Sequence, residues 1–311
     1  MALRTTTVPA VPAVPARRLR LPRDAALGYA MLAPAGLLLV VLVGYPMIVA
    51  FTMSLQRKLI GAPVAPFIGI DNYVTVLSDP TFWIAMRNVL VFAGVSVGVK
   101  LVLGTAVALT LNEAMPMRGV IRSIVIIPWA LPTLVTVLIW MWMYSDIGGV
   151  FNHILMGVGA INEPLLFLGH PVLAMVSVIV VNIWRGFPFF SVTLLAGLQS
   201  VGAELYDAAK VDGAGLWARF RHVTLPGLAP VMAVVTLLST IFTLNDFAII
   251  WLLTRGGPGN ATDVLPTLTY KVAIRGLELG KGVAISVLML PLLLVLIVLL
   301  TRFVNKREET A

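Results

Sequence analysis

The sequence predicts an all-α polytopic membrane protein with six transmembrane helices, and three observations support this fold class. Of 311 residues, 59% are hydrophobic and only 12% are charged, and the mean hydropathy is +0.98. Several uncharged stretches exceed the roughly 20 residues that an α-helix needs to cross a bilayer. A helix satisfies its backbone hydrogen bonds internally, as hydrocarbon requires, so we expect these stretches to be membrane-spanning helices.

Composition also argues against several kinds of function. The formal net charge of +8 could indicate nucleic-acid binding, but most Lys and Arg residues lie beside the predicted spans, where they act as orientation signals. Without cysteine the chain has no disulfide, thiolate nucleophile or cysteine-bound metal. The histidines His153, His170 and His222 lack the spacing of a metal site, and no Walker-type nucleotide loop is present. We therefore expect no catalytic centre, metal or cofactor on this chain.

The chain is expected to begin with a tail, residues 1–23, that is rich in Val, Pro, Ala and Arg. A tail of this kind cannot bury a core, so it is predicted to be disordered, basic and cytoplasmic. Residues 24–82 are predicted to form the first transmembrane helix, within the uncharged run 25–55, and an external loop. That run is too long for a signal-peptide core.

The remaining five spans are predicted to form a core at residues 83–303. The second span, residues 87–111, places Lys100 on one face with Gly104 and Ala108. Small residues in membrane helices mark close packing, so Lys100 should face protein or a polar cavity instead of lipid. A structural partner and a role in transport are both open for it.

Proline and polar residues are expected to disturb the next two spans. Pro128 and Pro132 should bend the third span, residues 123–144, because each removes a backbone hydrogen bond and crowds the preceding turn. The fourth span, residues 172–198, is predicted to be interrupted at residues 184–189, which include Arg, Gly and Pro.

The fifth and sixth spans are predicted at residues 228–253 and 283–303, followed by a cytoplasmic tail at 304–311. Between the fourth and fifth spans lies a polar loop, residues 200–227. Gly213 should end a first short helix there, as glycine does just past a C-terminus. A second short helix should begin at Leu216 and be closed by Pro226.

Charge bias predicts the orientation of the six spans. With the N-terminus inside, the inner side holds thirteen cationic residues: Arg4, Arg17, Arg18, Arg20, Arg23, Arg118, Arg122, Lys210, Arg219, Arg221, Arg302, Lys306 and Arg307. The outer side holds six: Arg57, Lys58, Arg255, Lys271, Arg275 and Lys281. Because thirteen cationic residues lie on the inner side and six on the outer side, we expect both termini and the polar loop to be in the cytoplasm.

The polar loop resembles the EAA loop of binding-protein-dependent ABC importer permeases. In that family an acidic residue and two alanines precede a glycine, and an aliphatic-x-Leu-Pro sequence follows. The matching positions here are Asp207, Ala208, Ala209, Gly213, Val223, Leu225 and Pro226. Asp207 stands where the family usually has Glu, and Val223 where it usually has Ile. The alternative is an ordinary solvated helix-turn-helix loop between two spans.

The resemblance implies a type I ABC importer permease fold in which the loop forms coupling helices that sit in a cleft of a cytoplasmic ATPase. Asp212, beside the glycine, belongs to the expected ATPase contact with the matched positions. The alanines let a helix lie close in a groove, and Asp207 can accept charge-assisted hydrogen bonds from a basic partner residue.

Further stretches extend the resemblance to carbohydrate-type permeases. Residues 67–73 and 79–83, with Asn88, look like the segment that precedes the core in that group. Residues 253–258 and 280–284 suggest its first membrane subunit, for which a sister permease completes the pore. The Gly-Gly-Pro turn at 256–258 is expected to be structural.

A solute path needs polar groups at membrane depth, where they are costly unless they face a cavity or each other. Compared with the maltose-type permease, two stretches match segments that supply sugar contacts. The expected path residues are Arg185, Gly186, Phe189, Ser239, Thr243, Asn245 and Asp246. Several differ from their counterparts, so a sugar-sized site for a different sugar is implied. Alternatively, Arg185 and Asp246 form a buried structural salt bridge.

The resemblance therefore implies the permease subunit of an ATP-driven importer, multi-pass in a bacterial inner membrane, for an oligosaccharide or a related polyol or glycerol phosphate. The implied partners are a sister permease in a heterodimer, two ATPase subunits that bind ATP and Mg, an extracytoplasmic solute-binding protein and lipid, without nucleic acid. An ion-coupled transporter using Lys100, Arg185 and Asp246 is one alternative, and it predicts a repeat in the two halves. An intramembrane enzyme is the other, although few catalytic residues are available.

Overall fold

The computed structural model describes residues 23–113 and 115–308, so most of the predicted N-terminal tail and the last three residues lie outside the described part. The described part is helical. Its only β-type pairing is an isolated antiparallel bridge between Gln56 and Phe67. The all-α prediction is therefore confirmed for these residues.

The chain divides into two compact units, residues 1–49 and 50–311. Within the first unit, α1 (Arg23–Leu39) continues through a π-helical turn, η1 (Val40–Gly44), into α2 (Tyr45–Ser54), which extends into the second unit. Residues Leu27–Ser54 form an apolar helix of 28 residues, long enough to cross a membrane. This helix agrees with the first predicted span.

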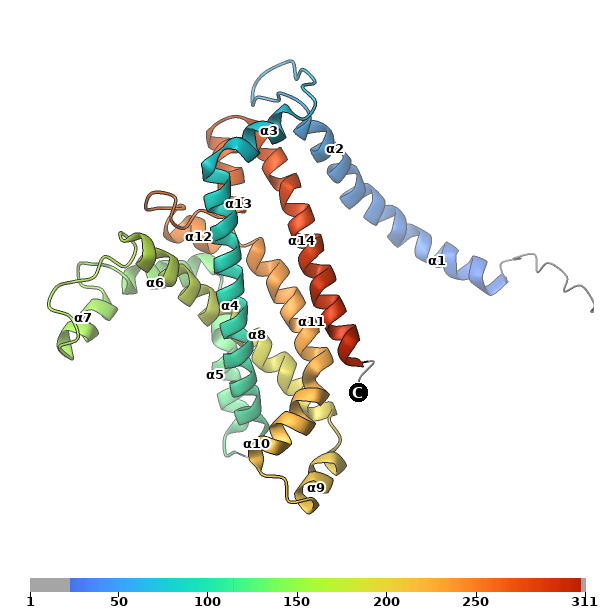
Figure 1. The fold of residues 1–311 in the computed structure, drawn as a ribbon, viewed down its shortest axis with the longest axis vertical. Helices are drawn as coiled ribbons and strands as arrows, with labels where there is room; N and C mark the ends of the chain where they lie inside the picture. Colours follow the sequence, from blue (N-terminus) through green and yellow to red (C-terminus); the bar gives the residue numbers. More distant parts are fainter. Residues whose placement is uncertain (1–22, 114, 309–311) are drawn as a thin grey trace, which may run out of the picture. The chain divides into compact units, whose positions relative to one another are not determined.

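Four long helices organise the second unit. They are α4 (Pro80–Asn112), α8 (Pro171–Ser200), α11 (Leu225–Leu244) and α14 (Leu279–Glu308). Helix α4 packs against α8 and α11, and α11 packs against α14 (Figure 1). Gly104 allows the first of these contacts, because a Cβ atom at this position would lie 2.3 Å from Cβ of Phe190 in α8. Close backbone approach at a small residue is the usual way in which membrane helices associate.

Shorter helices lie at the ends and flanks of these four. They are α3 (Asp71–Ser78), α5 (Arg118–Ala130), α6 (Thr133–Met143), α7 (Val150–Gly157), α9 (Ala203–Val211), α10 (Leu216–Arg219), η2 (Phe220–Thr224), α12 (Ala248–Leu253), α13 (Leu265–Tyr270) and η3 (Lys271–Arg275). Helices α9 and α10 lie at one end of the second unit, and α3 lies at the opposite end (Figure 1).

Two hydrophobic clusters form the core of this unit. The first joins α4, α6, α8, α12, α13 and α14 around side chains such as Phe92, Trp140 and Ile249. The second joins α4, α8 and α11 around side chains such as Phe190 and Leu228. Helix α4 contributes to both clusters and so connects them.

The described residues contain five helices that could span a membrane, or six if the pair α5 and α6 counts as one broken span. The two members of this pair meet at 92°. The predicted bend in the third span is thus present, and it is sharp enough to divide the span into two helices. Pro132 explains the position of the break, because proline disfavours helical backbone at the preceding residue, and Leu131 is indeed extended.

The prediction that the fourth span is interrupted at residues 184–189 is wrong. Helix α8 runs without a break from Pro171 to Ser200, with Pro188 in its interior. A membrane helix tolerates an internal proline where packing supports it, since only one backbone donor is missing. Pro188 is buried, which agrees with such support.

The helix of the predicted fifth span, residues 228–253, begins earlier than predicted and also ends earlier, at Leu244. The helix begins earlier, because residues Leu216–Leu244 form one helix of 29 residues. Pro226 therefore does not close a separate second helix as predicted. It occupies the first turn of α11, directly after the π-helical turn η2, where Leu225 N–H bonds back to the Phe220 carbonyl. The wider π turn accommodates the proline without ending the helix.

Candidate functional site

The helical break that the sequence predicts in the fourth span is found instead in the predicted fifth span. It lies between α11 and α12, at Asn245, Asp246 and Phe247. The Asp246 side chain explains it, because Oδ1 accepts a hydrogen bond from Ile249 N–H at 3.2 Å and so caps the first turn of α12. Asn245 Nδ2 donates to the Ile241 carbonyl at 2.8 Å. Such short polar side chains compete with the backbone for hydrogen bonds and favour helix ends.

A cavity of about 450 Å³ opens beside this break. Its walls include all seven residues that the sequence predicts for a solute path, and these come from α8, from α11 and from the break after α11: Arg185, Gly186, Phe189, Ser239, Thr243, Asn245 and Asp246. The structure therefore brings the predicted residues together at one place. The remaining lining residues are Lys100, Trp129, Thr133, Asn182, Phe242, Phe247, Ala248 and Ile249.

Arg185 and Asp246 do not form the ion pair that the sequence leaves open as an alternative, since none of the ion pairs among the described residues joins them. Asp246 Oδ2 instead accepts a hydrogen bond from Asn182 Nδ2 at 2.9 Å. The buried Nε of Arg185 has no hydrogen-bond partner in the described part of the chain. Leaving a buried donor without a partner is costly.

Lys100 enters the cavity from α4. Its side chain is buried, and Nζ donates a hydrogen bond to Thr243 Oγ1 at 3.0 Å. Gly186 makes room for it, because a Cβ atom there would lie 2.7 Å from Cε of Lys100. The sequence left open whether this lysine has a structural partner or a transport role. The structure provides a partner and also a cavity.

Asn182, Phe247 and Trp129 line the cavity but were missed by sequence reasoning. Asn182 could have been found, because it is a polar residue at membrane depth, one turn before Arg185 on the same helix. The two aromatic residues carry no comparable signal. Aromatic side chains are common in apolar helices, and only the packing shows which ones face a cavity.

The chemistry of the cavity is suited to binding a polar solute. Phe189 and Phe247 contribute aromatic side chains to its lining, while Arg185, Lys100 and Asp246 supply charged hydrogen-bonding groups. Among the described residues, no group of three or more His, Asp or Glu side chains is placed to hold a metal ion. Rings with charged hydrogen-bonding groups fit a polyhydroxylated solute.

The predicted coupling loop forms a compact helical turn. Helix α9 ends in a Schellman arrangement, in which Gly213 N–H bonds to the Lys210 carbonyl at 3.0 Å and Ala214 N–H to the Ala209 carbonyl at 2.9 Å. Gly213 has a φ of 77°, which explains why glycine stands there. As predicted from the sequence, this glycine ends the first short helix.

Polar and apolar side chains are both exposed on this turn. Asp207 pairs with Lys210 at 2.8 Å, and both side chains are more than half exposed. Ala208, Asp212 and Pro226 are exposed, while Ala209 and Leu225 are half-buried. The large apolar side chains left uncovered on the same surface are Leu205, Val211, Leu216 and Trp217. Such a patch on a polar loop indicates a protein contact surface.

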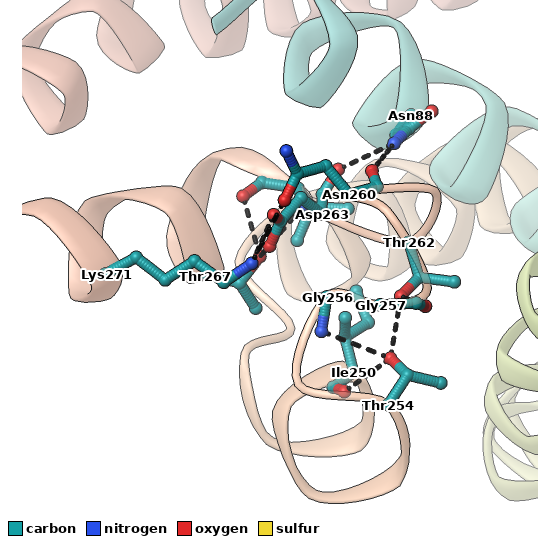
Figure 2. Close-up of polar contacts among 11 residues, drawn as sticks. Asn88, Ile250, Thr254, Gly256, Gly257, Asn260, Thr262, Asp263, Thr267 and Lys271 are labelled. Atoms are coloured by element: carbon teal, nitrogen blue, oxygen red, sulfur yellow. Dashed lines mark hydrogen bonds and ion pairs between the residues drawn. The ribbon is translucent and has the colours of Figure 1, made fainter. Parts of the chain in front are cut away.

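The loop between α12 and α13 is held by a buried polar network (Figure 2). Asn88 of α4 donates to the carbonyls of Asn260 at 3.0 Å and Asp263 at 2.9 Å. The fully buried Asp263 carboxylate pairs with Lys271 and accepts a hydrogen bond from Thr267. Nothing in the sequence pattern indicated this ion pair.

The Gly-Gly-Pro turn belongs to this network. A Cβ atom at Gly256 would lie 1.9 Å from Oδ1 of Asp263, and its φ is 82°, so only glycine fits. Thr262 donates a hydrogen bond to the Gly257 carbonyl at 2.7 Å. These contacts agree with the structural role that is expected for the turn.

The fold defines a polytopic helical membrane protein, and comparison with known proteins gives its family. Residues 100–309 match the family described as the binding-protein-dependent transport system inner membrane component. This chain belongs to that family. It is accordingly a component of a transport system and not an enzyme.

Curated relatives cover nearly the whole chain. The trehalose/maltose transport system permease protein MalF of Thermococcus litoralis is 41% identical over 272 residues, which make up 88% of this chain and 91% of MalF. The sulfoquinovosyl glycerol transport system permease protein SmoG of Agrobacterium fabrum is 33% identical, with 92% of each chain covered. A trehalose transport system permease protein, SugA of Mycobacterium tuberculosis, is 34% identical, covering 84% of this chain and 83% of SugA.

A solved structure agrees with the fold. A chain of a bacterial ABC transporter involved in the import of the acidic polysaccharide alginate matches with a TM-score of 0.79 and 26% identity, covering 91% of this chain and 96% of that one. The predicted type I ABC importer permease fold is thereby confirmed.

Proposed function

We propose that this chain is the permease subunit of an ATP-driven importer for a sugar, and that the cavity beside the break after α11 is the solute path. The observation that carries the proposal is the convergence of seven residues, expected from separate stretches of sequence, around one cavity. The relatives named above serve trehalose, maltose, sulfoquinovosyl glycerol and alginate, which supports a carbohydrate as the solute class.

The cavity suits such a solute. Its volume of about 450 Å³ lies within the range of small-molecule sites. The Phe189 ring can stack on the apolar face of a sugar ring, and Arg185 can donate paired hydrogen bonds to hydroxyl oxygens. Both carboxylate oxygens of Asp246 accept a hydrogen bond from the protein, yet each has a second lone pair for a hydroxyl donor.

The proposed motor contact is the surface formed by α9, the turn that follows it, α10 and the start of α11, with Asp207, Ala208, Ala209, Asp212, Gly213, Leu225 and Pro226. The helix that begins at Leu216 continues without a break to Leu244 beside the cavity. A helix of 29 residues is about 43 Å long. ATPase closure at α10 would therefore move the wall of the solute path directly, and the break at residues 245–247 would act as the hinge.

The proposed assembly contains this chain, a sister permease, two ATPase subunits that hold ATP and Mg, and an extracytoplasmic solute-binding protein. It resides in the inner membrane of a bacterium, with both termini in the cytoplasm. Lipid covers the apolar helix surfaces, and no nucleic acid takes part. Type I importers work by alternating access, so the cavity would open to each side in turn.

Reconstitution with the sister permease, the ATPase and the binding protein tests the proposal. We expect ATP-dependent uptake of trehalose or maltose into proteoliposomes. Asp207→Lys should reduce this uptake at least about tenfold while ATP hydrolysis persists, because a charge-assisted contact of roughly 1.5–3 kcal/mol is replaced by repulsion.

The matched control is Glu204→Lys, which makes the same charge change on an exposed residue one turn earlier in α9 and should leave uptake nearly unaltered. Solute accumulation by this chain without an ATPase, or ATP hydrolysis by the chain alone, would contradict the proposal. Normal uptake by Asp207→Lys would remove Asp207 from the motor contact.

A further inference from the structure

Lys100 is a buried cation at the meeting point of three helices. It belongs to α4, bonds to Thr243 of α11 and passes Gly186 of α8. The residue is only 3% exposed, yet it lines the cavity. A lysine in this position is costly in a membrane helix unless its charge is used.

The ammonium group of Lys100 has unused hydrogen-bond donors. A lysine carries three N–H donors. In the described part of the chain Nζ of Lys100 donates one hydrogen bond, to Thr243 Oγ1 at 3.0 Å. A hydroxyl oxygen alone does not neutralise a charged ammonium, so the contact with Thr243 orients Lys100 without satisfying it.

The charges around the cavity are unequal. Two cations, Lys100 and Arg185, face one carboxylate, Asp246. The carboxylate already accepts hydrogen bonds from Asn182 and from the backbone of Ile249. Among the described residues, it forms an ion pair with neither cation. The cavity therefore retains positive charge and unused donors.

From this geometry we propose that Lys100 is a specificity-determining residue of the solute path. Its ammonium group donates hydrogen bonds to oxygen atoms of the solute, and its charge favours solutes with hydroxyl or acid groups while it disfavours cationic solutes. Gly186 and Thr243 position it, the first by leaving room for the side chain and the second by holding Nζ. This inference rests on the proposed function of the cavity as the solute path.

Thiol labelling tests the position of Lys100 without knowledge of the solute. The chain has no cysteine, so each introduced cysteine is a unique site. In the importer purified with its partner subunits in lipid nanodiscs, we expect a water-soluble thiosulfonate to modify Lys100→Cys and Asn245→Cys. It should not modify Val97→Cys, which lies one turn away on α4 in an apolar cluster.

The labelling outcomes separate the two proposals. Reaction of Asn245→Cys without reaction of Lys100→Cys would overturn the role of Lys100 and leave the solute path intact. If neither cysteine reacts, the cavity is not a water-accessible path, and the proposed function of the cavity fails as well.

A second measurement tests the charge and does not depend on Lys100→Cys folding. With Asn245→Cys as reporter, the labelling rate of a sulfonate-bearing reagent is divided by that of a trimethylammonium-bearing reagent. Removing the charge with Lys100→Met should lower this ratio about tenfold, the size expected for one charge within a few ångströms in a partly shielded cavity. Lys100→Arg should retain most of the ratio. An unchanged ratio in Lys100→Met would overturn the proposal.

Discussion

Two lysines with carboxylate partners show how burial decides what a charge contributes. Lys210 and Asp207 are both exposed on α9, where water screens their attraction. Lys271 pairs with Asp263, whose side chain is fully buried and also accepts a hydrogen bond from Thr267. The first pair is free to exchange partners at an interface, whereas the second holds the loop between α12 and α13.

We predict that Lys271→Met destabilises the protein by about 3 kcal/mol, because it leaves the buried Asp263 carboxylate without its cation. The matched variant Lys210→Met, which removes the same group from an exposed pair, should cost less than about 1 kcal/mol. Thermal unfolding in detergent measures both changes. Equal shifts in the two variants would contradict the structural role of the Asp263 network.

At the scale of elements, the contact between α4 and α8 depends on one glycine. A Cβ atom at Gly104 would lie 2.3 Å from Cβ of Phe190 and 3.2 Å from the backbone nitrogen of Ser191. Neither atom can move without moving helix α8. The two helices that carry Lys100 and Arg185 are therefore held at a separation that a larger residue would increase.

We predict that Gly104→Ala destabilises the protein by about 1–3 kcal/mol through overpacking, although alanine is the better helix former. Gly98→Ala is the matched control on the same helix, since a Cβ atom there meets nothing within 4 Å. It should be neutral or stabilising in the isolated chain. Denaturant or thermal unfolding distinguishes the two, and a stable Gly104→Ala variant would mean that α4 and α8 can separate at little cost.

At the scale of the whole molecule, the second unit has different chemistry at its two ends. The α9–α10 turn exposes a mixed polar and apolar surface at one end, while α3 and the network around Asp263 lie toward the other (Figure 1). Long helices connect these ends past the cavity. Such a layout suits a subunit that is driven at one membrane surface and receives solute at the other.

We predict the orientation that the charge bias favours, with the α9–α10 turn in the cytoplasm. Asp212→Cys, at an exposed position of this turn, should react with a membrane-impermeant thiol reagent only in inside-out vesicles. Ile147→Cys, in the exposed loop after α6, should react only from the outside of intact cells. Labelling of Asp212→Cys from outside would reverse the predicted topology and remove the proposed motor contact.

The amino-acid pattern alone was enough for the membrane class, most of the spans and the Gly213 turn, whereas the expectation for Phe189, Ser239 and Thr243 came from the resemblance to the maltose-type permease. Hydropathy and turn chemistry are local properties, so they can be read from neighbouring residues. The pattern was misleading where local signals compete: Arg185, Gly186 and Pro188 suggested a break in α8, yet packing keeps that helix whole. The break occurs at Asn245–Phe247, where Asp246 finds side-chain and backbone partners.

Only the packing of helices decided which charges meet. Asp246 bonds to Asn182, 64 positions away, instead of pairing with Arg185, and Lys100 reaches Thr243 across 143 positions. Asp263 pairs with Lys271 because the lysine side chain reaches back along α13 to the end of the preceding loop, which Asn88 of α4 holds in place. Such partners depend on the separation and rotation of neighbouring helices, which are set jointly by many side chains. No single stretch of the chain contains that information.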